Sequence, residues 1–188
     1  MGRAAQIGRA AILEAALKIA DDQGLDAVTM HAVARRLHVT PMALYRHVAS
    51  KAALLDGLVE VLLTELPLPS RELPWEEFLT ALATGIRATA RRHPGAFPLL
   101  LSRPTVTPAA TDVRDAVHQA LRQAGVRDIE VARTERLLST AVLGFAVSEA
   151  AGRFRRHDQA IIDADFAELQ QWLRRLLPRS AARAATLP

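Results

Sequence analysis

The stretch that decides the fold is Thr29-Met-His-Ala-Val-Ala-Arg-Arg-Leu-His-Val-Thr-Pro-Met-Ala-Leu-Tyr-Arg-His-Val48. Val33 and Leu37 stand one helical turn apart, so both side chains can face a core. Leu44 and Val48 are expected to face the same core. Thr40 followed by Pro41 is typical of the N-cap and first residue of a new helix. The stretch therefore predicts two short helices joined by a tight turn. Since it carries Arg and His but no acidic residue, it has the character of a helix-turn-helix that binds DNA.

The basic character is concentrated at the N-terminal end of the chain. Residues 1–51 contain seven Lys or Arg and four Asp or Glu, a net charge of +3, so the remainder carries only +1 of the total of +4. A basic end on a nearly neutral body suits binding of a polyanion by one small domain. The chain has no Cys, which excludes disulfides and thiolate sites and indicates a cytoplasmic protein. No signal peptide or membrane-spanning run is visible, so we expect no membrane partner.

Apolar residues recur with helical period along nearly all of the chain, and no alternating strand pattern occurs, so the predicted class is all-α. Gly24 is expected to end the first helix, Thr29 to cap the second at its N-terminus and Ser50 to begin the fourth. The predicted helices outside the quoted stretch cover residues 9–23, 51–66, 75–93, 109–124, 129–155 and 163–177, with a short segment at 96–101. The predicted domains are a helix-turn-helix domain over 1–50, a connecting helix over 51–66, a larger helical domain over 67–178 and a mobile tail over 179–188.

Several fragments, in this order and at this spacing, resemble the TetR family of transcriptional regulators. The fragments are Ala11-Ile-Leu-Glu-Ala-Ala16, Gly24-Leu-Asp-Ala-Val-Thr29, Val33-Ala-Arg-Arg-Leu37, Ala43-Leu-Tyr-Arg-His-Val48 and Ser50-Lys-Ala-Ala-Leu-Leu55. The C-terminal part looks like the effector domain of the tetracycline-repressor-like branch. The resemblance implies a DNA-binding domain of three N-terminal helices, followed by a helical domain that binds a small-molecule effector and forms a homodimer.

One residue departs from the family pattern. His38 stands in the turn between the second and third helices, where the family usually has Gly, because Gly adopts a positive φ without penalty. His tolerates that region better than most residues, so we expect the turn to form at some local cost. Its imidazole is either a weak phosphate contact or a solvated turn residue.

The predicted contacts to a double-stranded DNA operator lie on the turn, the third helix and the start of the fourth. Arg46 is the predicted base reader, because a guanidinium can bond guanine O6 and N7 together. Tyr45 and His47 are expected to contact phosphates, as the matching family positions do, and Lys51 adds a cation at a helix N-terminus. The full predicted set is Thr29, His31, Thr40, Pro41, Met42, Ala43, Tyr45, Arg46, His47 and Lys51.

The larger domain provides two further sets of candidates. Residues expected to line a ligand pocket, and equally suited to a plain core, are Phe78, Leu82, Ile86, Phe97, Leu100, Val117, Leu121, Leu138 and Val142. Residues expected at the homodimer interface, formed by the last two helices, are Phe145, Glu149, Leu169, Trp172, Leu173 and Leu176. The carboxylate of Glu149 either contacts a ligand or lies at the subunit interface, and we favour the interface.

Two other classes of function are alternatives to a regulator. An enzyme is not expected, because the chain has no Gly-rich phosphate loop and no nucleophile elbow, and its six His residues are scattered. For the same reason no cofactor and no metal site are predicted. A helical module that binds ligands or proteins and has lost operator binding remains the alternative. Repression is the family default, although the sequence does not distinguish a repressor from an activator.

Overall fold

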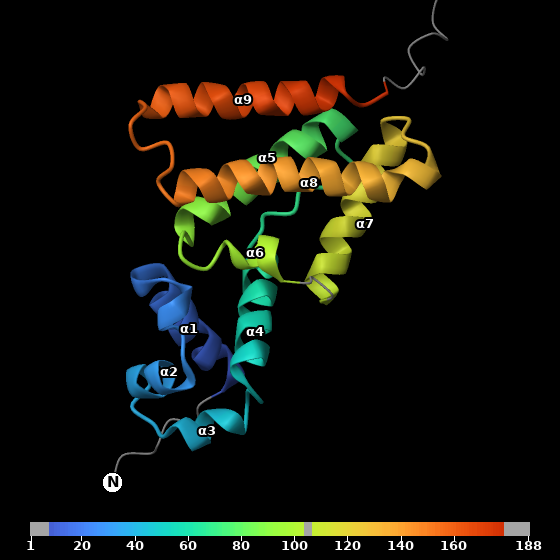
Figure 1. Ribbon diagram of the computed structural model, residues 1–188. Helices are drawn as coiled ribbons and strands as arrows, with labels where there is room; N and C mark the ends of the chain where they lie inside the picture. The colour runs from blue at the N-terminus through green and yellow to red at the C-terminus, as the bar shows by residue number, and fades with distance from the viewer. Residues whose placement is uncertain (1–7, 104–106, 179–188) are drawn as a thin grey trace, which may run out of the picture. The chain divides into compact units, whose positions relative to one another are not determined.

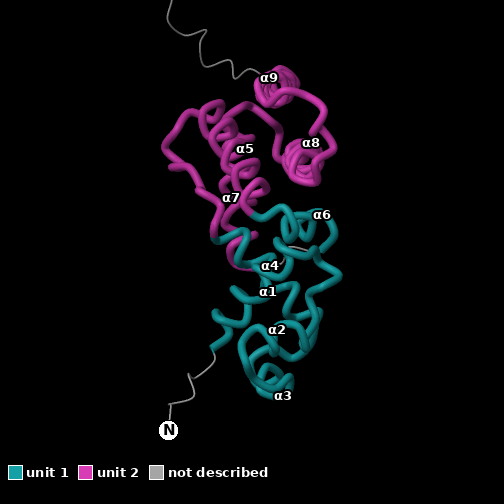
Figure 2. The backbone as a smooth tube through the Cα atoms, turned by 90° about the vertical axis from the view of Figure 1, so that its left-hand side faces the viewer, with its two compact units in different colours: residues 1–64, 93–105 teal, residues 65–92, 106–188 magenta. Residues whose placement is uncertain are grey.

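The computed structural model describes residues 8–103 and 107–178, and within these ranges every regular element is a helix (Figure 1). The all-α prediction is confirmed. The chain separates into two compact units (Figure 2): unit 1 contains residues 1–64 and 93–105, and unit 2 contains residues 65–92 and 106–188.

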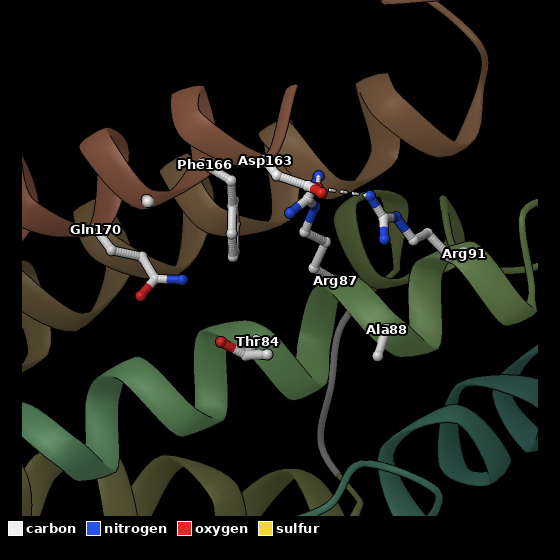
Figure 3. A pocket seen from close by; sticks show the side chains of 8 residues that line it. Thr84, Arg87, Ala88, Arg91, Asp163, Phe166 and Gln170 are labelled. Atoms are coloured by element: carbon white, nitrogen blue, oxygen red, sulfur yellow. Dashed lines mark hydrogen bonds and ion pairs between the residues drawn. The ribbon is translucent and has the colours of Figure 1, made fainter. Parts of the chain in front are cut away.

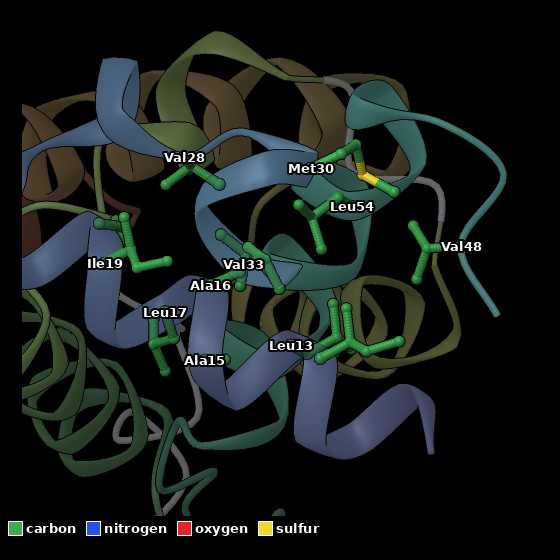
Figure 4. Close-up of a cluster of buried hydrophobic side chains, with 14 of the residues drawn as sticks. Leu13, Ala15, Ala16, Leu17, Ile19, Val28, Met30, Val33, Val48 and Leu54 are labelled. Atoms are coloured by element: carbon green, nitrogen blue, oxygen red, sulfur yellow. The ribbon is translucent and has the colours of Figure 1, made fainter. Parts of the chain in front are cut away.

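Unit 1 is a small bundle built mainly from the N-terminal third of the chain. It contains α1 (Arg9–Gln23), the 3-10 turn η1 (Leu25–Ala27), α2 (Met30–Arg36), α3 (Pro41–Tyr45), α4 (Lys51–Thr64) and the short α6 (Leu99–Ser102). The apolar stripe of α1 packs against α2 and α4, as Figure 4 shows for Ile19, Val33 and Leu54. Each fully buried Leu or Ile in such a core contributes roughly 1.5–3 kcal/mol.

The helix starts of unit 1 follow the capping residues in the sequence, with one difference. Thr29 Oγ1 accepts a hydrogen bond from Ala32 N at 3.0 Å, and Ser50 Oγ accepts one from Ala53 N at 3.1 Å. Both residues therefore cap the helices that they were predicted to begin. Thr40 has the extended backbone of an N-cap and Pro41 occupies the first turn of α3, but the Thr40 side chain makes no cap hydrogen bond.

The part of unit 2 that the structure describes contains four longer helices: α5 (Trp75–Arg92), α7 (Pro108–Gln123), α8 (Asp128–Ala150) and α9 (Gln159–Arg175). α5 packs against both α7 and α8, and α9 lies along α5 and α8 (Figure 1). The last helix starts at Gln159, four residues before the predicted position. Its apolar stripe begins earlier than we had predicted, since Ile162 is buried one helical turn before Phe166. α8 ends at Ala150 rather than continuing to residue 155, since Gly152 takes a φ of 74°.

The segment after α5 packs within unit 1, on the C-terminal end of α1. His93 Nδ1 lies 2.7 Å from Asp21 Oδ2, and the backbone N–H groups of Gly95 and Ala96 donate to Asp21 Oδ1 at 3.2 and 3.3 Å. Only Gly fits at position 95, because a Cβ there would overlap the backbone carbonyl of Ala20. Further along, Arg103 donates to Asp56 of α4 at 2.8 Å.

The structural grouping differs from the predicted domain limits. α4 packs with α1 and α6 in unit 1, whereas we had set residues 51–66 apart as a connecting helix, and residues 93–105 also belong to unit 1. The predicted tail at 179–188 lies outside the described residues.

Candidate functional site

The helix α3 is held in place by its buried face. Leu44 is 0% exposed and Val48 is 3% exposed, and both belong to the unit 1 core, which also contains Val33 of α2. Leu44 also accepts the backbone hydrogen bonds of His47 and Val48, each at 2.9 Å, which continue the turn beyond the helix. The outward face of this short helix is therefore fixed by the core beneath it.

The turn between α2 and α3 forms with His38 in the left-handed region, at a φ of 57°. The backbone N–H of His38 donates to Arg35 O at 3.2 Å, and that of Val39 donates to Ala34 O at 2.9 Å. These bonds end α2 in the manner of a Gly-terminated helix. The expectation that His would take the positive φ normally given to Gly is confirmed.

Most of the predicted DNA contacts are exposed on the surface of unit 1. Met42 is 71% exposed and Tyr45 is 48% exposed, although both side chains would stabilise a core if buried. The other exposed members of the predicted set are Thr29, His31, Thr40, Arg46, His47 and Lys51, and the half-buried ones are Pro41 and Ala43. The hydroxyl oxygen of Thr29 already accepts the cap hydrogen bond from Ala32, so it can offer only its O–H to a phosphate.

The cations of this surface differ in how they are paired. Arg36 lies 3.6 Å from the Asp22 carboxylate. Among the described residues, neither Arg46 nor Lys51 forms a salt bridge or a side-chain hydrogen bond with another residue, and both are exposed. Lys51 is also the first residue of α4, where free backbone N–H groups and the helix dipole favour an anion. Unpaired cations beside a helix N-terminus suit phosphate binding.

The residues predicted to line a ligand pocket are distributed over several cores. Phe78 and Leu82 belong to a cluster between α5 and α7, Leu121 to a second cluster with Val131, and Val142 to a third with Phe166. Ile86, Val117 and Leu138 are partly buried against these clusters. Phe97 and Leu100 lie in the segment that belongs to unit 1. In the structure these side chains act as core residues.

A groove of about 350 Å³ lies between α5 and α9, within unit 2 (Figure 3). Its size is that of a small-molecule site. None of the predicted pocket residues lines it; the lining residues are Thr84, Arg87, Ala88, Arg91, Asp163, Phe166, Ala167 and Gln170. The signal that could have pointed to it is Arg87, a cation on the inward face of α5 that also carries Ala83 and Ala90.

The groove is bordered by an ion-pair cluster of four side chains. Arg87 donates to both carboxylate oxygens of Glu149, at 2.6 and 2.7 Å, and to Asp163 at 2.7 Å. Arg91 donates to Glu149 at 2.6 Å and to Asp163 at 3.1 Å. The Arg87 guanidinium also lies over the Phe166 and Phe145 rings, at 4.7 and 5.7 Å from the centroids, a geometry that favours a cation.

The cluster keeps its buried carboxylate ionised. Burial alone would raise the pKa of Glu149, but the hydrogen bonds from Arg87 and Arg91 outweigh it and hold the pKa at about 2. The hydrogen bond to Glu149 likewise raises the pKa of Arg87 against the opposing effect of burial. Both groups are therefore charged throughout the physiological range.

The predicted dimer residues fall into two groups. Trp172 and Leu176 are 58% and 78% exposed, as expected of interface residues in a single chain. Phe145, Leu169 and Leu173 pack instead beside Phe166 in the core between α8 and α9. The side chain of Glu149 is only 7% exposed and engages Arg87 and Arg91 of its own chain. Its place at the subunit interface or at a ligand stays a prediction.

None of the helices within residues 8–103 and 107–178 is both long and apolar enough to cross a bilayer.

Two family models match the chain. The model described as "Bacterial regulatory proteins, tetR family" matches residues 12–58, and "Tetracyclin repressor-like, C-terminal domain" matches residues 79–172. Among curated proteins, the chain is 32% identical over 161 residues to the HTH-type transcriptional repressor DrrR1 of Streptomyces coeruleorubidus, covering 85% of this chain and 60% of that protein. The chain spans 66% and 48% of the next two curated relatives.

Solved structures agree with these matches. BioQ of Mycobacterium smegmatis is 29% identical, with a TM-score of 0.76, over 89% of this chain and 95% of that chain. A structure of BioQ with its natural double-stranded DNA operator is 28% identical, with a TM-score of 0.74, over 90% and 99%. ActR of Streptomyces coelicolor in complex with (S)-DNPA is 25% identical, with a TM-score of 0.72, over 90% and 88%.

Proposed function

Because the chain belongs to the TetR family of bacterial regulatory proteins, we propose that it is a sequence-specific DNA-binding transcriptional regulator of the cytoplasm. The observation that carries the proposal is the outer surface of α3 and the start of α4. Buried Leu44 fixes the orientation of α3, while Arg46 and Lys51 remain exposed and form no salt bridge among the described residues. A rigid helix with free cations is the arrangement that major-groove recognition requires.

The proposal includes a homodimer and a small-molecule effector. A single α3 is short and can read few base pairs, whereas two copies related by a two-fold axis read a palindrome. ActR, a relative in structure, has been solved with a bound small molecule. The regulator acts as a repressor, and the effector releases it by preferring a conformation in which the two α3 helices no longer match the operator spacing.

The test is selection of genomic DNA fragments by the purified full chain, followed by titration of each selected fragment across salt concentrations. A palindromic site is expected, with an affinity that falls steeply between about 50 and 200 mM salt because bound phosphates release counterions. Lys51→Ala should make the slope of log affinity against log salt less steep by about 1.8, since a dimer loses two phosphate contacts. Arg46→Ala should relax the preference for one base pair in each half-site.

The matched control is the double variant Arg155→Ala, Arg156→Ala, which removes two exposed cations from unit 2. It should keep the operator affinity and the salt slope of the wild type. If neither the wild type nor the control binds any fragment above background, the chain is a ligand- or protein-binding module without operator binding, which is the alternative function.

A further inference from the structure

The groove between α5 and α9 presents two guanidinium groups to a space that is large enough for a small molecule (Figure 3). Arg87 is 8% exposed and is held rigidly, because its Nε and one Nη donate to Glu149 while the Phe166 ring covers one face. Arg91 lies one helical turn further along α5 and shares the same two carboxylate partners. Preorganised guanidinium groups of this kind bind carboxylates in a fixed geometry.

The two carboxylates of the cluster are not equivalent. The side chain of Glu149 is 7% exposed, whereas that of Asp163 is 52% exposed and lies at the edge of the groove. Without Asp163, two Arg and one Glu leave a net charge of +1 beside the cavity. Asp163 therefore supplies from α9 the second negative charge that the two guanidinium groups need, and it does so from a position that solvent can reach.

The rest of the groove offers an apolar surface with polar groups at its far end. Phe166 presents its ring, and Ala88 and Ala167 present methyl groups, while Thr84 and Gln170 provide a hydroxyl and an amide. This combination fits a molecule with one anionic end and an apolar body.

The groove lies on the side of α9 away from the exposed apolar residues. With 100° per residue, Trp172 and Ile161 point roughly half a turn away from Asp163, while Ala167 and Gln170 share its side. A homodimer that buries Trp172 consequently leaves the groove open to solvent.

From these observations we propose that the α5–α9 groove binds a small organic carboxylate, whose carboxylate group takes the place of Asp163 on Arg87 and Arg91. The apolar body of the ligand lies against Phe166. The site is contained in unit 2 and its occupation requires no DNA. This inference rests on the proposed function in one respect: the bound carboxylate is the effector of the regulator. Because carboxylate binding is measured without DNA, the carboxylate site and operator binding can be refuted independently.

The test is isothermal titration calorimetry on the full chain, with benzoate, 4-phenylbutanoate and octanoate as probes and the corresponding neutral amides as controls. At least one carboxylate should bind, and at least roughly tenfold more tightly than its amide, because the two guanidinium groups require an anion. Arg91→Gln should weaken carboxylate binding by roughly tenfold or more. Its thermal melting is measured in parallel, so that a loss of folding is recognised.

The decisive variant is Asp163→Asn, which removes the competing internal anion. Carboxylate binding should become roughly three- to tenfold tighter, whereas a purely structural role of Asp163 predicts unchanged or weaker binding. Asp165→Asn is the matched control, since Asp165 is exposed and lies on the opposite side of α9, and it should leave the affinity unchanged. The proposal is overturned if no probe binds at concentrations up to about 10 mM, because the dissociation constant would then be weaker than the millimolar range. It is also overturned if the amides bind as tightly as the carboxylates, or if the Asp163→Asn variant binds carboxylates no more tightly than the wild type does.

Discussion

Glu149 shows at the scale of one residue how a helical bundle holds a buried charge. Its pKa of about 2 lies below the ordinary value of 4.5 because hydrogen bonds from Arg87 and Arg91 overcome the effect of burial. A carboxylate whose folded-state pKa is lowered stabilises the fold fully above its unfolded pKa and loses that contribution as the pH falls toward the folded pKa. The stabilisation of the fold by ionised Glu149 is therefore lost between about pH 4.5 and pH 2.

Glu149→Gln should lower the free energy of unfolding at pH 7 by about 3 kcal/mol, because the shift of the Glu149 pKa is lost and Arg87 is left without its main partner. The difference in stability between wild type and variant should shrink as the pH is lowered from 5 to 3. Urea denaturation at a series of pH values measures both quantities. Glu168→Gln is the control, because the half-buried Glu168 of α9 has only a long ion pair of 3.9 Å to Arg175. A wild-type-to-variant difference independent of pH would contradict the prediction.

His38 carries a local cost that the fold tolerates. A non-Gly residue at a φ of 57° is less stable there than Gly. His38→Gly should raise the free energy of unfolding by about 0.5–1 kcal/mol, after allowance for the greater freedom of Gly in the unfolded chain. Chemical denaturation measures the change.

His31→Gly is the control for that experiment, because His31 is exposed within α2, where Gly lowers stability. The two substitutions should have opposite signs. If His38→Gly and His31→Gly both lower the free energy of unfolding, the backbone of His38 is not strained.

At the scale of elements, the contact between residues 93–96 and the end of α1 depends on close backbone approach. Gly95→Ala would place a Cβ against the carbonyl of Ala20 and push the segment away from Asp21, which bonds the N–H groups of Gly95 and Ala96. The expected loss of stability is about 1–3 kcal/mol, measured by thermal melting. Pro94→Ala, at the exposed neighbouring residue, should cost less than about 1 kcal/mol; equal costs for the two variants would rule out the steric explanation.

The boundaries of the elements show which local signals are reliable. Thr29 and Ser50 were predicted to begin helices and do so with side-chain caps, because a cap involves residues only three apart in sequence. The start of α9 at Gln159 was missed: Asp158, the N-cap residue, makes no side-chain cap hydrogen bond, and the prediction did not include Ile162, which is buried one turn before Phe166. A capping side chain is thus readable from sequence, whereas a helix start without one is harder to locate.

At the scale of the whole molecule, Trp172 and Leu176 require a partner if the protein is a dimer. Trp172→Glu should shift the protein from dimer to monomer, with a dissociation constant at least roughly tenfold higher, because a charge would be buried in an apolar interface. Sedimentation velocity measures the shift. In DNA titrations the monomeric variant should show about half the salt slope of the wild type, since half of the phosphate contacts are lost.

Leu101→Glu provides the control, because Leu101 is 46% exposed but lies on α6, outside the two helices assigned to the interface. It should leave the sedimentation coefficient unchanged. A Trp172→Glu protein that remains dimeric would remove Trp172 from the interface.

The sequence by itself determined the all-α class, the limits of α1 and the short helices α2 and α3, and the sides on which Leu44 is buried and Arg46 is exposed. These features follow from helical periodicity and capping, which act over a few residues. Only the tertiary structure decided that residues 93–103 belong to unit 1 and that Arg87 pairs with Glu149 and Asp163, 62 and 76 residues away. Such contacts depend on how whole helices pack, and a periodic apolar stripe shows which face is buried without showing what it is buried against.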